Sequence, residues 1–167
     1  MAREFLPAPE LLSTVTQPGM EVFQVTTDPA APCNIFYNYH QACDPSGRFV
    51  LLNRVGPTGN TLLLCDLEDR FTLEPVTDSS DRLAGGHLGL SFSPDGQHIW
   101  YSLLTPKALE IRRRPLTSGE GELVFTVPLV RADFGGRRIT GGRWLSFSHD
   151  GKRLLCVVNL GPVDKYN

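Results

Sequence analysis

A four-residue turn occurs three times in this chain, and it constrains the fold more than any other feature. The turns are DPSG at 44–47, SPDG at 93–96 and SHDG at 148–151. An apolar stretch precedes each turn, and a polar residue and a second apolar stretch follow it. Proline presets the φ angle at the second position of a turn, and glycine supplies the positive φ that a tight hairpin requires. The repeat therefore predicts three β-hairpins.

The spacing of these hairpins predicts a β-propeller. Gly47, Gly96 and Gly151 are 49 and 55 residues apart, which is close to the roughly 40–50 residues of a four-stranded propeller blade. Short apolar runs fill the intervals, and no segment has the i, i+3, i+4, i+7 apolar pattern of a helix. We predict an all-β chain, a propeller fragment of about 2.5–3 four-stranded blades with an additional N-terminal ring-closing strand.

The strand pattern also predicts the domain boundaries. We expect an N-terminal extension over 1–19 and a partial propeller domain over 20–167. The domain divides into a ring-closing strand over 20–26, a blade over 28–80, a second blade over 81–130 and an incomplete blade over 131–167. The strand at 20–26 is expected to be the outer strand of the last blade, so that it pairs the two ends of a closed ring.

Within these units the sequence predicts individual strands. The first blade is expected to have strands at 36–44, 48–55, 60–67 and 70–77, with Pro75 on an edge strand. The second is expected to have strands at 87–93, 97–103, 108–113 and 122–127, and the third at 141–148 and 152–160. Because the third blade has only two strands, we expect an unpaired apolar edge that makes residues 1–167 alone unstable or prone to aggregation.

Composition and charge exclude several classes of protein. The net charge of −2 gives no strong field, so we expect neither nucleic acid nor a membrane surface as a partner. Glu4, Pro7 and Pro9 stand where a signal peptide would have its apolar stretch, and we therefore expect a cytoplasmic protein. The four cysteines form no CxxC pair, and those within apolar runs, Cys43 among them, are expected to be structural thiols.

Candidate binding residues gather at one mouth of the predicted channel. The innermost strand of each blade lines the channel, so its start lies at the end opposite the turns. The candidates at or before these starts are Asn38, Tyr39, His40, His87, Arg138 and Arg143. Arginine pairs with a carboxylate, and an aromatic ring packs on the apolar face of a sugar. Histidine binds a metal or moves a proton. Together these residue types suit an anionic sugar.

Two of these residues also have structural interpretations. Neighbouring residues on a strand face opposite sides, so Tyr39 and His40 cannot both reach the channel. His40 is equally well interpreted as a hydrogen-bonded structural histidine.

His98 and His149 lie at the hairpin end and are expected to have no role in binding. Arg112, Arg113 and Arg114 lie at the end of the strand predicted at 108–113. Because successive side chains of a strand face opposite sides, at least one of these arginines is expected to be solvated.

Four segments resemble the oligogalacturonate lyase family and its relatives among the TolB-type, WD-like propellers. They are GMEVFQVT at 19–26, NIFYNY at 34–39, the strand-and-hairpin segment 42–69, and GGHLGLSFSPDGQHIWY at 85–101. The resemblance covers most of the chain. It implies a seven-bladed propeller that cleaves short pectin-derived oligogalacturonides by β-elimination with a bound divalent metal, typically manganese.

The resemblance does not supply catalytic residues for this chain. The metal-ligand histidines and glutamine of the family, and its proposed base, come from later blades, so no metal ligand or base is assigned here. We expect the N-terminal part of a polysaccharide lyase, inactive by itself, that binds an acidic oligosaccharide and needs the remainder of the propeller to close the ring. The alternatives are a non-catalytic TolB-type binding or interaction module, and the propeller domain of a peptidase.

Overall fold

The computed structural model describes residues 6–7, 23–26, 30, 33–35, 42–56, 60–77, 81, 83, 89–117 and 119–162. Within these ranges the regular elements are twelve strands and one short 3-10 turn, η1 (Ala132–Phe134). None of the described residues forms a helix long and apolar enough to cross a membrane. The predicted all-β fold class is confirmed.

Two four-stranded antiparallel sheets form complete blades. Blade 1 has the strand order β3 (Cys33–Ile35), β4 (Phe49–Val55), β5 (Asn60–Asp66), β6 (Thr72–Pro75). Blade 2 has the order β7 (Leu90–Phe92), β8 (His98–Leu104), β9 (Ala108–Pro115), β10 (Glu122–Pro128). In both blades each strand pairs with the next one along the chain, so the first and last strands are the two edges.

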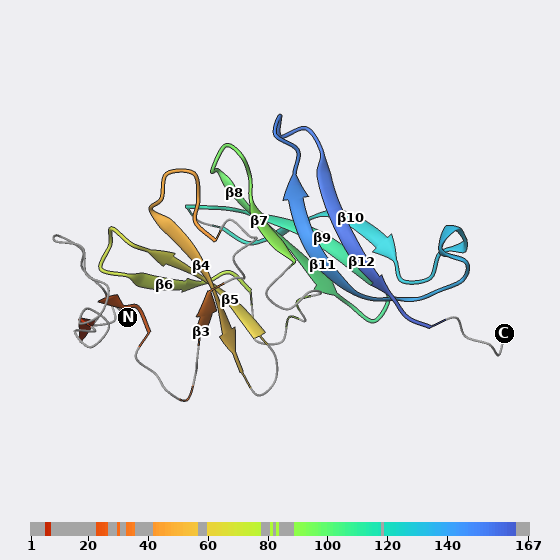
Figure 1. The fold of residues 1–167 in the computed structure, drawn as a ribbon, viewed down its shortest axis with the longest axis horizontal. Helices are drawn as coiled ribbons and strands as arrows, with labels where there is room; N and C mark the ends of the chain where they lie inside the picture. Colours follow the sequence, from red (N-terminus) through yellow and green to blue (C-terminus); the bar gives the residue numbers. More distant parts are fainter. Residues whose placement is uncertain are drawn as a thin grey trace, which may run out of the picture.

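The remaining strands form two sheets of two strands each. Blade 3 consists of β11 (Ile139–Phe147) and β12 (Leu154–Leu160). Near the N-terminus, β1 (Leu6–Pro7) pairs with β2 (Phe23–Gln24). In Figure 1 these two small sheets lie at opposite ends of the molecule. The segment expected at 20–26 therefore pairs with β1 in this structure.

The three repeated turns point to the same side of the molecule, at the top of Figure 1. Their glycines have φ angles of 78°, 68° and 68°. Ser93 Oγ donates to the Asp95 carboxylate at 2.5 Å, and Ser148 Oγ donates to Asp150 at 2.6 Å. In the first turn the two residue types exchange places, since Ser46 Oγ donates to Asp44 at 2.5 Å. In each turn, the serine and aspartate side chains thus hydrogen-bond to each other. Because all the residues that stabilise the turn lie within it, the motif can be recognised from the sequence.

Successive turns also contact one another. A Cβ atom built on Gly96 would lie 3.3 Å from Cδ of Pro45, and one on Gly151 would lie 3.4 Å from Cγ of Pro94. Among the described residues, none lies within 4 Å of the corresponding position on Gly47. The proline of one turn therefore packs on the glycine of the next, and this contact sets the spacing between adjacent blades at the turn end.

Substituting Gly96 by alanine is expected to destabilise the fold more than substituting Gly47. Both glycines have positive φ, which costs a residue with a Cβ atom about 1–2 kcal/mol. Only at Gly96 does the new methyl group also press on a proline ring of the neighbouring blade. Urea unfolding of the two variants measures the difference, and equal losses of stability would contradict the turn-to-turn contact.

The apolar core lies between the blades. The cluster between blades 1 and 2 includes Leu51, Leu62, Leu90 and Ile99. The cluster between blades 2 and 3 is built on Leu109, Ile111, Leu129, Ile139 and Leu145. A third cluster on the opposite face of blade 1 contains Leu52, Leu63 and Cys65, with Val25 packed against it. Both faces of blades 1 and 2 are therefore used, as expected when blades stack in series.

Three sequence expectations need correction. The last strand of blade 1 begins at Thr72 instead of Arg70, because Arg70 and Phe71 adopt positive φ angles of 50° and 56° in the preceding turn. Its inner strand β3 starts earlier than residue 36, and residues 36–41 lie outside the described residues. Cys43 is exposed, although it follows the apolar alternation of the strand pattern.

Acid is expected to weaken blade 1 through Asp66. The Arg48 guanidinium donates to this carboxylate at 2.9 Å and 2.6 Å and lowers the pKa of Asp66 below its ordinary value of 3.8, although partial burial opposes the shift. A lowered folded-state pKa contributes stability above the ordinary value, and this stability is lost as the pH falls through the folded-state pKa. Urea melts from pH 7 to pH 3 test this, and Asp66→Asn should flatten the acid limb. An unchanged limb in that variant would exclude Asp66 as its source.

Candidate functional site

The structure describes part of the predicted channel mouth. Asn38, Tyr39, His40 and His87 lie outside the described residues. Arg143 lies on β11, but its side chain also lies outside what the structure describes. Arg138 is described, and it precedes β11 at the end of the blades opposite the turns.

In the two complete blades, residues on both sides of two candidate positions pair with the second strand of the blade. In blade 1, Ile35 pairs with Leu52, and Cys43 pairs with Val50. In blade 2, Leu83 pairs with Leu103, and Leu90 pairs with Tyr101. His40 and His87 fall between these pairs in the sequence and lie outside the described residues.

The inner strand of blade 3 pairs irregularly at Arg143. Gly142 pairs with Val158, but Trp144 pairs with Val157, so Arg143 is the extra residue of a β-bulge. Bulges redirect side chains and occur often beside functional sites. The sequence predicted regular strands here, because an apolar alternation does not reveal a local insertion. Of the candidate positions, Arg143 thus coincides with a departure from regular pairing.

A groove of about 620 Å³ lies at the mouth between blades 2 and 3. It is lined by Asp81, Leu103, Leu104, Thr105, Pro106, Leu129, Arg138, Ile139 and Thr140. The Arg138 guanidinium is exposed and donates one hydrogen bond to the Pro106 carbonyl at 3.2 Å. Among the described residues no carboxylate lies within ion-pair distance of it. Arg138 is therefore positioned to bind an anion that enters the groove.

Hydroxyl groups and one carboxylate complete the polar lining of this mouth groove. Thr105 Oγ1 donates to the Ala108 carbonyl and accepts from the Ala108 N–H, both at 3.0 Å. Thr140 Oγ1 donates to the Asn159 carbonyl at 3.3 Å. Burial raises the pKa of the Tyr101 hydroxyl, and the negative charge of the Asp81 carboxylate raises it by a smaller amount. The tyrosine is therefore a neutral structural group at neutral pH.

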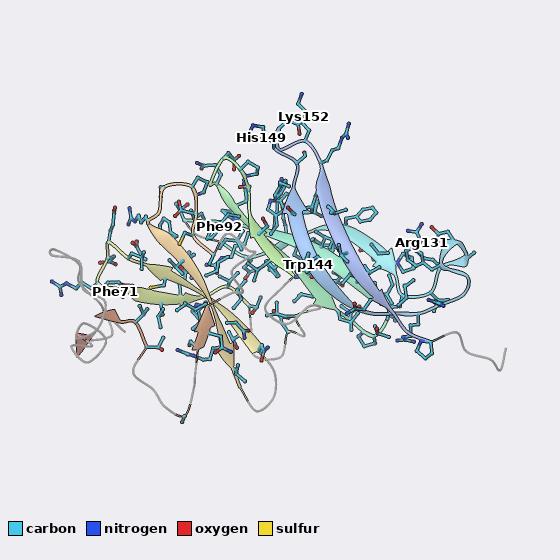
Figure 2. All side chains as sticks on the ribbon, viewed as in Figure 1. Phe71, Phe92, Arg131, Trp144, His149 and Lys152 are labelled. Carbon is cyan, nitrogen blue, oxygen red and sulfur yellow. The ribbon has the colours of Figure 1, made fainter. Side chains whose placement is uncertain are left out.

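A second, larger groove follows the inner strands of blades 2 and 3. Its volume is about 870 Å³, and its lining comprises Pro45, Leu90 to Pro94, Trp144 to His149, Leu155 and Val157. Trp144 is 42% exposed. Figure 2 shows Phe92 and Trp144 among the strands, and His149 near the turn at the top. His149 is thus far from the mouth groove, as expected for a residue at the hairpin end.

The described residues do not fit the manganese ion that the family resemblance implies. No three histidine, cysteine, aspartate or glutamate side chains among them lie together as a metal site would require. Burial raises the pKa of the Cys65 thiol to about 11 and also raises that of Cys156. Both thiols are therefore protonated at neutral pH, which suits packing and not metal ligation.

Comparison with known proteins supports the fold. No protein family and no curated protein matches the sequence. Among solved structures, the chain is similar to the oligogalacturonate lyase from Vibrio parahaemolyticus, with a TM-score of 0.62 and 15% sequence identity. The match covers 90% of this chain and 34% of the lyase chain, so this chain spans about a third of the length of its structural neighbour. At this identity the similarity shows the fold alone, an all-β propeller fragment.

Proposed function

We propose that this chain supplies the first blades of a propeller that binds an acidic oligosaccharide, and that the whole propeller is a lyase for pectin-derived oligogalacturonides. The observation that carries the proposal is the exposed guanidinium of Arg138 in the mouth groove. The fold around it is similar to that of an oligogalacturonate lyase. The propeller beyond these blades is a partner that the proposed activity requires.

The chemistry of the groove supports binding of a uronate. A guanidinium forms a charge-assisted hydrogen bond with a carboxylate, and the Thr105 and Thr140 hydroxyls lie in the same groove. The sequence predicts that His87 and Arg143 lie at the same mouth. In β-elimination a base removes the proton next to the uronate carboxylate, and positive charge neutralises the developing enolate. We assign Arg138 to the carboxylate, and neither a base nor a metal-dependent step to the described residues.

Titration with trigalacturonate tests the binding role of Arg138. Arg138→Ala is expected to weaken binding about tenfold or more, because a hydrogen bond to a charged group contributes about 1.5–3 kcal/mol. Arg137→Ala is the matched control, since Arg137 is an exposed neighbour that does not line the groove. Calorimetry with neutral galactotriose should show no comparable affinity. Equal binding of both sugars, or equal losses in both variants, would contradict the proposal.

The lyase assignment has its own test. The full propeller, incubated with trigalacturonate and Mn²⁺, is expected to form an unsaturated uronate that absorbs in the ultraviolet. Binding without any product, under every divalent metal tried, would favour the non-catalytic TolB-type module instead.

A further inference from the structure

The side chains that line the mouth groove differ in whether they can still donate a hydrogen bond to a ligand. Thr105 Oγ1 directs its hydrogen to the Ala108 carbonyl at 3.0 Å, and Thr140 Oγ1 directs its hydrogen to the Asn159 carbonyl at 3.3 Å. Both hydroxyl hydrogens are thus used within the protein. The Arg138 guanidinium has several N–H groups and donates to one backbone carbonyl. Among the described side chains of the groove, Arg138 is therefore the one with donors left for a ligand.

The rest of the lining is apolar or accepts hydrogen bonds. The acceptors are the Asp81 carboxylate and the Thr140 hydroxyl oxygen, because an ionised carboxylate cannot donate. A second carboxylate of a ligand would leave water in this groove without gaining a donor, and such a loss is unfavourable. The hydroxyls of a neutral sugar, in contrast, would find acceptors. The apolar lining residues are Leu103, Leu104, Pro106, Leu129 and Ile139.

The charges near Asp81 also disfavour a second carboxylate. The Arg112 guanidinium donates through Nε to the Glu110 carboxylate at 2.9 Å. This hydrogen bond raises the pKa of Arg112 above its ordinary value of 12.5, and the charge of Asp81 adds to the shift in smaller part. Two carboxylates thus act on one guanidinium, which does not neutralise both. A ligand carboxylate is therefore attracted at the Arg138 end of the groove and repelled at the Asp81 end.

We propose that the mouth groove selects a free uronate that adjoins a neutral sugar unit, such as a uronate whose carboxyl is methyl-esterified. This inference rests on the proposed function and narrows its ligand class to partly esterified oligogalacturonides. The free carboxylate pairs with Arg138, and the hydroxyls of the neutral unit donate to Asp81. The ester methyl group packs on the apolar lining. Asp81 is then a specificity-determining residue of the groove.

Calorimetry with three forms of trigalacturonate tests this selectivity. They are the triacid, a dimethyl ester with one free carboxylate, and the trimethyl ester. The dimethyl ester is expected to bind about tenfold more tightly than the triacid, because it brings no second carboxylate into a groove without a donor for it. The trimethyl ester is expected to bind more weakly than the dimethyl ester, because it has no carboxylate for Arg138. Equal affinities for the triacid and the dimethyl ester would overturn the proposal.

Asp81→Asn tests whether this carboxylate sets the preference. The amide removes the negative charge and supplies a donor, so the affinities for the triacid and the dimethyl ester should come within about twofold of each other. Asp133→Asn is the matched control, since Asp133 is an exposed carboxylate that pairs with Arg131 at 2.5 Å and does not line the groove. It should keep the full preference. A preference unchanged in Asp81→Asn, or lost equally in both variants, would overturn the role of Asp81.

The results also separate this inference from the proposed function. If none of the three sugars binds, the proposed function fails and the inference fails with it. If the triacid binds through Arg138 at least as tightly as the dimethyl ester, the proposed function stands and the preference for a neutral neighbour is wrong. The comparison of the three sugars uses the natural sequence, so it decides the preference even where Asp81→Asn does not fold.

Discussion

Leu51→Ala is expected to destabilise the protein by about 2–5 kcal/mol, the range for removing a buried leucine side chain from a packed core. Leu51 is 0% exposed, and it lies in the cluster that joins blade 1 to blade 2. Truncation removes apolar contacts and leaves a cavity between two rigid sheets, which cannot collapse without breaking strand pairing. Chemical denaturation monitored by tryptophan fluorescence measures the change.

Leu123→Ala provides the matched control for that substitution. Leu123 is the same residue type on the outer strand of blade 2, and it is 51% exposed. Its truncation is expected to change the free energy of unfolding by less than about 1 kcal/mol, because little apolar surface is removed from the core. Similar losses for the two variants would mean that the contact between blades 1 and 2 does not carry the stability assigned to it.

Gly121→Ala is expected to destabilise the protein by about 1–3 kcal/mol through overpacking. A Cβ atom on Gly121 would overlap the Tyr101 hydroxyl oxygen. Tyr101 is 3% exposed and packs in the core between blades 1 and 2, so its ring cannot move aside freely. The glycine is needed here for close approach, and not for an unusual backbone angle.

Removing the hydroxyl should relieve this clash. In the Tyr101→Phe background, the closest contact of the new methyl group becomes the ring carbon Cζ at 3.0 Å. Gly121→Ala is therefore expected to lose less stability in that background than in the natural sequence, a non-additive result that a double-mutant cycle measures. If the stability losses of the two substitutions were strictly additive, the destabilisation by Gly121→Ala would not arise from the Tyr101 hydroxyl but from another contact in the β9–β10 connection.

The sequence predicted local features of the fold well because their causes are local. The turns at 44–47, 93–96 and 148–151 contain the proline, glycine and hydrogen-bonding side chains that form them. Strand alternation then predicted blade 2 within a few residues of its observed bounds. The prediction was weaker where pairing is interrupted, since the bulge at Arg143 depends on its register with β12.

Contacts between blades were not predictable in the same way. Alternation predicted at least one solvated arginine in the run at 112–114, and Arg113, with a side chain 41% exposed, fits that expectation. Arg114, in contrast, is buried against blade 1, where it pairs with Glu74 and donates to the Pro75 carbonyl at 2.6 Å. No periodicity indicates a partner about forty residues away, because such a contact depends on how two sheets stack.

The sequence was therefore sufficient to predict the all-β fold class and the three turns, since both depend on neighbouring residues. The tertiary structure decided which groups share a surface. It placed Arg138 in the mouth groove beside two threonines, and it packed blade 3 against blade 2. These features arise from sheets packing on one another, because packing brings together residues that no spacing along the chain connects.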